Sequence, residues 1–135
     1  MLLGDMIHPE LVSAISICGH GDKLLIADGN YPLASKSGES KKIYLGLTPG
    51  MPNVTQVLKA ILSCINVEKV EIMLPETGPE PEIVAELRDI LSGTLIEGMT
   101  RQEFYRAASA PEVFLAISTG ELRTYSNILV TVGVR

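Results

Sequence analysis

A chain of 135 residues is long enough to bury a hydrophobic core as one domain, 1–135, and its 46% hydrophobic content is typical of a globular protein. A net charge of −5, scattered basic residues and an aromatic content of 4% exclude a protein that binds nucleic acid through phosphate contacts or base stacking. No stretch approaches the roughly 18 consecutive apolar residues of a membrane span, and the first residues lack the features of a secretory signal, so no membrane partner is expected.

Helical and strand patterns alternate from the amino terminus onward. Pro9 suits the first turn of a helix with one apolar face, and Gly19 is the natural stop of that helix. A buried strand is expected at 24–27, followed by a loop at 29–40 that is rich in Gly, Pro, Ser and Lys. The segment 43–47 predicts a second, weaker strand.

The alternation continues through the second half of the chain, where two helix starts carry a capping box. Asn53 with Gln56 begins one of these helices, and Thr100 with Glu103 begins the other, which covers 104–108. The remaining expected segments are a strand at 70–74, a helix at 80–91, a strand at 94–98 and two final strands at 113–117 and 127–132.

Strands that alternate with helices predict a layered fold. We expect an α/β protein with a single three-layer α/β/α domain and a mainly parallel, mixed central sheet. The sequence contains no internal repeat and no linker long enough to divide it.

Two cysteines are present, and each falls on the apolar face of an expected helix. Cys18 and Cys64 have no CxxC spacing, so we expect two buried free thiols in a reducing compartment. A cytoplasmic location follows from this expectation.

The first candidate site residue is a histidine between two glycines. His20 lies outside any apolar stripe, and the flanking Gly19 and Gly21 leave its imidazole accessible, although a satisfied core histidine is the alternative. Asp28 stands at the carboxyl end of a strand, where open α/β sheets bind ligands, although it could simply cap the turn at Gly29. The pair indicates proton transfer on a polar small molecule.

Other residues and motifs narrow the chemistry further. Arg101 begins a helix, where its charge opposes the helix dipole, which indicates an anchored role unless it is a solvated surface arginine. His8 is expected to be exposed or to cap a helix, and its spacing from His20 matches no known metal site. Phosphate-binding and dinucleotide-binding glycine motifs are absent, so neither a cofactor nor a metal is expected.

Several short motifs occur together, in order, over nearly the whole chain. They are Gly19-His20-Gly21-Asp22, the turn 28–32, the segment 101–107, Thr119-Gly120-Glu121, the segment 125–129 and the final Gly133-Val134. In this order and spacing they resemble the ribose pyranase and L-fucose mutarotase family.

The resemblance implies a role for six residues. His20 would be the proton donor. The positions that would bind sugar are Asp28, Arg101, Tyr125, Ser126 and Asn127. The position of Arg101 is arginine in fucose mutarotases and histidine in ribose pyranases.

Features of both branches of the family are present. Arg101, the Phe104-Tyr105 pair and the turn 28–32 resemble the fucose branch, whereas the stretch 46–52 resembles the ribose branch. We therefore expect a mutarotase for an L-fucose-like sugar. The alternatives are a D-ribose pyranase and a non-catalytic sugar-binding partner of a transport system.

Self-association is also expected. The mean hydropathy of +0.26 is high for a small soluble chain and indicates an apolar interface. The resemblance implies a ring-shaped homo-oligomer, commonly a decamer, with its sites at subunit boundaries.

Overall fold

Six strands form one mixed sheet in the order β2-β5-β1-β6-β3-β4, in a computed structural model that describes residues 1–135. The strands are β1 (Lys23–Ala27), β2 (Lys41–Tyr44), β3 (Val67–Met73), β4 (Leu95–Met99), β5 (Val113–Ser118) and β6 (Ile128–Val132). Neighbouring strands are parallel except at β6, which is antiparallel to both β1 and β3. The expected mixed, mainly parallel sheet is confirmed.

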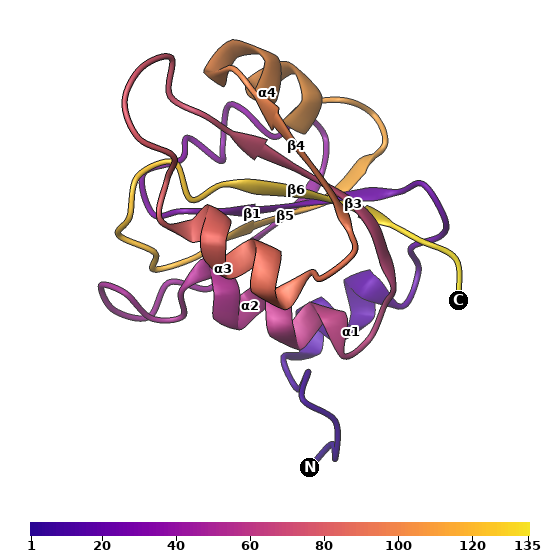
Figure 1. Cartoon of the computed structure of the whole chain (residues 1–135). Helices are drawn as coiled ribbons and strands as arrows, with labels where there is room; N and C mark the ends of the chain where they lie inside the picture. The colour runs from indigo at the N-terminus through magenta and orange to yellow at the C-terminus, as the bar shows by residue number, and fades with distance from the viewer.

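Helices cover both faces of this sheet, but unequally. The helices are α1 (Pro9–Ile15), α2 (Val54–Leu62), α3 (Ile83–Ile90) and α4 (Arg101–Ala108). In Figure 1, α1, α2 and α3 lie below the sheet and α4 lies alone above it, which confirms the three-layer arrangement. The larger hydrophobic core lies on the three-helix side, and a smaller core packs around Phe104 under α4.

The local signals in the sequence mark the helix starts well. Both capping boxes form: Asn53 and Gln56 bond reciprocally at the start of α2, and Thr100 and Glu103 do so at the start of α4. His8 caps α1, because its Nδ1 accepts a hydrogen bond from the backbone N–H of Leu11 at 3.3 Å. The expected capping role of His8 is therefore confirmed.

The ends of the elements differ more from expectation. Helix α1 ends at Ile15, before Gly19. Helix α3 begins at Ile83 rather than at residue 80, because prolines in the segment 79–81 lack the backbone N–H that a helix interior needs. Strand β2 ends at Tyr44 rather than near residue 47, because the chain turns there and the N–H of Leu47 bonds to the carbonyl of Met51 at 2.9 Å.

The expectation of two buried thiols is wrong for Cys64. Helix α2 ends at Leu62, so Cys64 lies beyond the helix and is exposed, while Cys18 lies beyond α1 and is half-buried. Each sulfur therefore lies outside the helix whose apolar face was expected to bury it.

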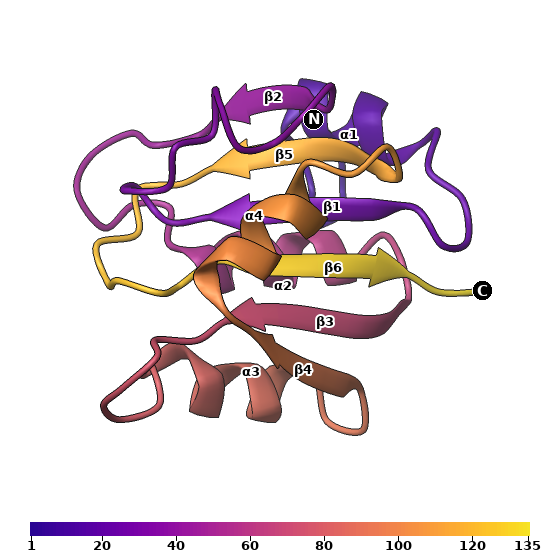
Figure 2. The same ribbon diagram turned by 90° about the horizontal axis from the view of Figure 1, so that it is seen from above.

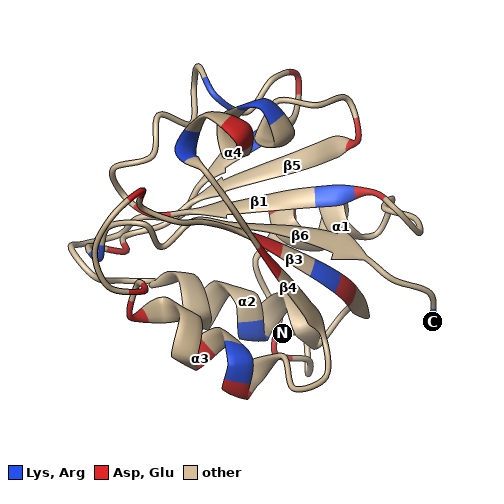
Figure 3. Ribbon diagram, turned by 45° about the horizontal axis from the view of Figure 1, so that its top comes forward, with Lys and Arg blue, Asp and Glu red and all other residues tan.

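Acidic and basic residues alternate along much of the chain, and β3 carries both (Figure 3). Glu71 on β3 is 4% exposed, and its carboxylate pairs with Lys23 and with Lys69, both at 3.1 Å. This charge is therefore compensated by two partners within the fold.

No helix in the structure is both long and apolar enough to cross a bilayer.

The sheet brings several chain ends to one edge. The carboxyl ends of β1, β2, β3 and β5 point the same way, and the amino end of β6 lies among them (Figure 2). Helix α4 also begins on that side, directly after β4. Side chains at Asp28, Arg101 and 124–127 are therefore placed near one another, although they are far apart in sequence.

Candidate functional site

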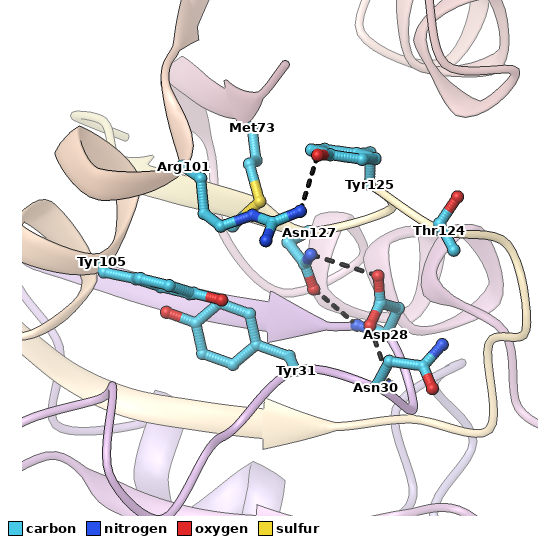
Figure 4. A pocket seen from close by; sticks show the side chains of 9 residues that line it. All are labelled: Asp28, Asn30, Tyr31, Met73, Arg101, Tyr105, Thr124, Tyr125 and Asn127. Atoms are coloured by element: carbon cyan, nitrogen blue, oxygen red, sulfur yellow. Dashed lines mark hydrogen bonds between the residues drawn. The ribbon is translucent and has the colours of Figure 1, made fainter. Parts of the chain in front are cut away.

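A cavity of about 250 Å³ lies at this edge of the sheet (Figure 4). The residues that line it are Asp28, Asn30, Tyr31, Met73, Arg101, Tyr105, Thr124, Tyr125 and Asn127. Four of the five positions expected to bind sugar are among them. The fifth, Ser126, is 1% exposed and contributes its backbone N–H, while its hydroxyl is buried without a partner.

A buried carboxylate organises the polar side of the cavity. Asp28 is 2% exposed and accepts hydrogen bonds from the N–H of Asn30 at 2.9 Å, the side-chain amide of Asn127 at 3.1 Å and the N–H of Ser126 at 3.3 Å. In return, the Asp28 N–H donates to Oδ1 of Asn127 at 2.8 Å. This exchange fixes the amide orientation of Asn127 and holds the start of β6 against the end of β1.

The environment of Asp28 shifts its protonation equilibrium. Burial raises the pKa of its carboxyl above the ordinary value, because the charged form loses contact with water. The hydrogen bonds from the backbone and from Asn127 oppose this rise, since they favour the carboxylate, but they do not cancel it.

Arg101 and Tyr125 meet across the mouth of the cavity. Nη2 of Arg101 donates to the Tyr125 hydroxyl at 2.7 Å, and the guanidinium carbon lies 5.4 Å from the centroid of the Tyr125 ring. The Thr100 capping box fixes the first turn of α4 and so places Arg101. Arg101, which was expected to be anchored, is therefore held by Tyr125 within the site.

The backbone at Tyr125 is unusual. Its φ is 56°, in the left-handed region that a residue other than glycine occupies at a cost of about 1–3 kcal/mol. Such a conformation persists only when the surrounding structure holds it in place. The next residue is held by its bond to Asp28.

Aromatic side chains form the other side of the cavity (Figure 4). The Tyr31 ring meets the rings of Phe104 and Tyr105 edge-on, with centroids 6.1 Å and 5.5 Å apart, and the Tyr31 hydroxyl donates to the Lys36 carbonyl at 2.7 Å. Burial raises the pKa of Tyr31, so its hydroxyl stays protonated. This side is apolar and fixed, whereas the Asp28 side offers hydrogen bonds.

Five residues that line the cavity were not among the candidate site residues predicted from the sequence. They are Asn30, Tyr31, Met73, Tyr105 and Thr124. Signals for two of them were present, because Tyr31 lies in the turn after Asp28 and Tyr105 follows Arg101 by one helical turn. Met73 ends β3, and nothing in its sequence context distinguishes it from other core residues.

His20 is not part of this cavity. His20 precedes β1, whereas Asp28 follows β1. The five residues of this strand span roughly 16 Å, so the two side chains start from opposite ends of that length. The His20 imidazole is exposed, lies 3.0 Å from the Glu68 carboxylate and lines a separate groove of about 880 Å³. A satisfied core histidine is thereby excluded, and within one chain Asp28 and His20 lie at opposite ends of β1.

The fold and the cavity together define a class of protein. A small concave site with a ring of hydrogen-bonding side chains on one side and fixed aromatic rings on the other suits a small polar molecule with hydroxyl groups and an apolar face. Its place at the carboxyl ends of parallel strands is where α/β proteins bind such ligands.

Within that class the chain belongs to the RbsD / FucU transport protein family, whose model matches residues 1–135. The resemblance to ribose pyranases and L-fucose mutarotases is thereby confirmed.

Similar proteins include members of both branches. A D-ribose pyranase of Variovorax paradoxus is 35% identical over 132 residues, covering 96% of this chain and 95% of the relative. Among solved structures, Bacillus subtilis RbsD in complex with D-ribose has a TM-score of 0.88 at 27% identity, covering 100% of this chain and 99% of that chain. The Streptococcus pneumoniae fucose mutarotase in complex with L-fucose has a TM-score of 0.83 at 27% identity, covering 96% and 94%.

Substitution of Asn127 tests the electrostatics of the cavity. Asn127→Ala removes a donor that favours the Asp28 carboxylate, so the pKa of Asp28 should rise further above its ordinary value. A carboxyl whose pKa is raised on folding stabilises the fold below its unfolded pKa, and this contribution is lost as pH rises through the folded pKa. In Asn127→Ala, the stabilisation that protonated Asp28 gives to the fold should therefore persist to higher pH before it is lost.

The measurement is a ¹³C NMR titration of the Asp28 carboxyl, together with denaturation at several pH values. Asn30→Ala is the control, because the bond from Asn30 to Asp28 comes from the backbone and survives the substitution. Equal Asp28 titration curves in the two variants would show that the Asn127 amide does not stabilise the Asp28 carboxylate.

Proposed function

We propose that this protein is a sugar isomerase that interconverts the anomers of a free aldose by opening and reclosing its ring. The observation that carries the proposal is the cavity that gathers Asp28, Arg101, Tyr125 and Asn127 from three separate parts of the chain. The names of the similar proteins, D-ribose pyranase and fucose mutarotase, support the same class of reaction.

The reaction needs only proton transfer. A base takes the proton of the anomeric hydroxyl while an acid protonates the ring oxygen, and the bond between the anomeric carbon and the ring oxygen breaks to give the open aldehyde. Rotation about the bond to the carbonyl carbon and reclosure return either anomer, or a ring of another size. Acid–base assistance of this kind is worth about 10²–10⁴-fold, which suits a reaction that is slow but spontaneous.

The cavity residues would hold the sugar. Asp28 and Asn127 offer acceptors and a donor at fixed positions, because each orients the other. Arg101 presents a planar fork of N–H groups, only one of which is used by Tyr125. A site built to pair hydroxyl groups rejects analogues that lack them, which gives selectivity among sugars.

His20 would supply the acid–base group, but from a second copy of the chain. Because His20 lies at the far end of β1 from the cavity, a single copy presents the sugar-holding groups and the imidazole at different ends. A ring in which the His20 end of one copy meets the cavity of the next would complete every site. Val134, which lines the same groove as His20, and Ile17, three residues before His20 in the chain, are exposed and available for such a contact.

The particular sugar is proposed from Arg101. A guanidinium can span two hydroxyls, so the protein would act on an L-fucose-like hexose more readily than on D-ribose. D-ribose pyranase activity is the second candidate, favoured by the relative from Variovorax paradoxus. The reaction would take place in the cytoplasm, in a homo-oligomer such as a decamer.

Replacement of His20 tests the proposed chemistry. His20→Ala should reduce anomer exchange at least about 10²-fold, because the acid–base group is lost, while the thermal unfolding curve stays close to that of the wild type. Exchange is measured by saturation-transfer NMR on a panel of aldoses. His8→Ala is the control, since His8 caps α1 away from the cavity. Retention of more than about a tenth of the wild-type rate would exclude this role.

A site shared between copies predicts complementation. Arg101→Ala and His20→Ala chains, co-expressed with different tags and purified as mixed oligomers, should exchange anomers faster than either variant alone, because some sites receive both native residues. Sedimentation should show an oligomer at micromolar concentration. Mixed oligomers no faster than their parents, or a monomer, would count against a shared site.

Substitution of Arg101 tests the proposed choice of sugar. The wild type should accelerate anomer exchange of L-fucose more than ring exchange of D-ribose, and Arg101→His should narrow or invert that ratio, because imidazole lacks the fork of donors. Arg106→His, on the exposed side of the same helix, is the matched control. An unchanged ratio after Arg101→His would shift the assignment to the ribose branch.

A further inference from the structure

A cluster of charged groups lies directly before Tyr125, outside the cavity. Glu121 is 4% exposed, and its carboxylate accepts bonds from Nε and Nη2 of Arg123 at 3.1 Å and 3.0 Å. Burial alone would raise the pKa of Glu121, but the bonds from Arg123 outweigh it and hold the pKa below its ordinary value. The buried carboxylate is therefore charged and fully paired.

Arg123 extends this pairing to a helix. Its Nη1 donates to Glu86 on α3 at 2.5 Å, so one guanidinium bridges two carboxylates. Glu121 also accepts the N–H of Val54 at the start of α2, at 3.4 Å. The Glu121–Arg123–Glu86 network thus attaches the segment before Tyr125 to α2 and α3, two of the three helices below the sheet.

The same segment is fixed to the Asp28 side of the cavity through its backbone. The N–H of Gly29 donates to the Glu121 carbonyl at 2.9 Å. A Cβ on Gly29 would lie 3.1 Å from that carbonyl oxygen, closer than an ordinary van der Waals contact, so the two segments pack tightly at this point. The backbone of Glu121 is therefore attached directly to the turn that follows Asp28.

We propose that Arg123 is a positioning residue of the sugar site, which holds Thr124 and Tyr125 so that the Tyr125 hydroxyl faces Arg101. The left-handed backbone at Tyr125 persists only where the surrounding structure holds it. Asp28 supplies the restraint after Tyr125 through the Ser126 N–H, and the Glu121–Arg123–Glu86 network supplies the one before it. The proposal rests on the proposed function of the cavity.

The role requires arginine chemistry. A guanidinium donates from three nitrogens in a fixed plane, and all three are used here, by Glu121 and Glu86. A lysine at position 123 keeps the charge but donates from a single nitrogen, so it cannot hold both carboxylates in the same geometry. Lysine should therefore restore the function only in part.

The test compares Arg123→Gln and Arg123→Lys with a matched control, Arg88→Gln. Arg88 lies on α3 and pairs with Glu80 through two bonds, at 2.9 Å and 2.6 Å, and it has no hydrogen bond or ion pair with the segment 119–127. Anomer exchange is measured against sugar concentration. Arg123→Gln should raise KM on the order of tenfold with little change in kcat, because ground-state and transition-state binding are weakened alike. Arg123→Lys should lie between it and the wild type, and Arg88→Gln should match the wild type.

A second readout does not depend on activity. Hydrogen exchange of the Ser126 amide, which bonds to Asp28, should be faster on the order of tenfold in Arg123→Gln and unchanged in Arg88→Gln. A wild type that exchanges no aldose would refute the proposed function, and the Ser126 amide would still decide the restraint. A purely structural arginine would lower the folded fraction and the apparent kcat without raising KM.

The positioning role is overturned by any of three results. These are an unchanged KM in Arg123→Gln with an active wild type, an equal rise in KM in Arg88→Gln, or an unchanged exchange rate of the Ser126 amide.

Discussion

The reciprocal hydrogen bonding of Asp28 and Asn127 connects the end of β1 to the start of β6, and the candidate site depends on it. The two residues are 99 positions apart in sequence, yet each satisfies the other's buried polar groups at 2.8 Å and 3.1 Å. Leaving either group unpaired would cost about 1–3 kcal/mol, so the pairing fixes both side chains. The N–H of Ser126 joins the same carboxylate, and through it the backbone of Tyr125 is held.

This arrangement follows from the one strand that runs against the others. Because β6 is antiparallel to β1, its amino end lies at the edge where β1 ends, and the segment 124–127 reaches the cavity as the chain enters the strand. A parallel β6 would have placed its carboxyl end there and removed Tyr125 and Asn127 from the site. The mixed topology is therefore a condition for the cavity as well as a feature of the fold.

The same strand geometry separates the two halves of the proposed chemistry. His20 lies before the start of β1, and Asp28 lies directly after its end. The hydrogen-bonding groups of the cavity and the His20 imidazole therefore do not meet within one chain. Under the proposed function, self-association would be needed to bring His20 of one copy to the cavity of another. The Glu121–Arg123–Glu86 network lies on the cavity side, where Arg101 donates to the Tyr125 hydroxyl, and its proposed role is to hold that geometry for a sugar.

The types of most elements, the capped starts of α2 and α4, the mixed α/β class and the family could all be predicted from the sequence, because they depend on local periodicity, caps and ordered motifs. It also named Asp28, Arg101, Tyr125 and Asn127. The three-dimensional structure was needed to show that these four meet in one cavity while His20 lies elsewhere, and that Cys64 is exposed. It was also needed to show that Tyr31, Met73 and Tyr105 complete the wall of the cavity. Those facts depend on strand order and on where helices end, which arise from contacts between distant segments and leave no local pattern.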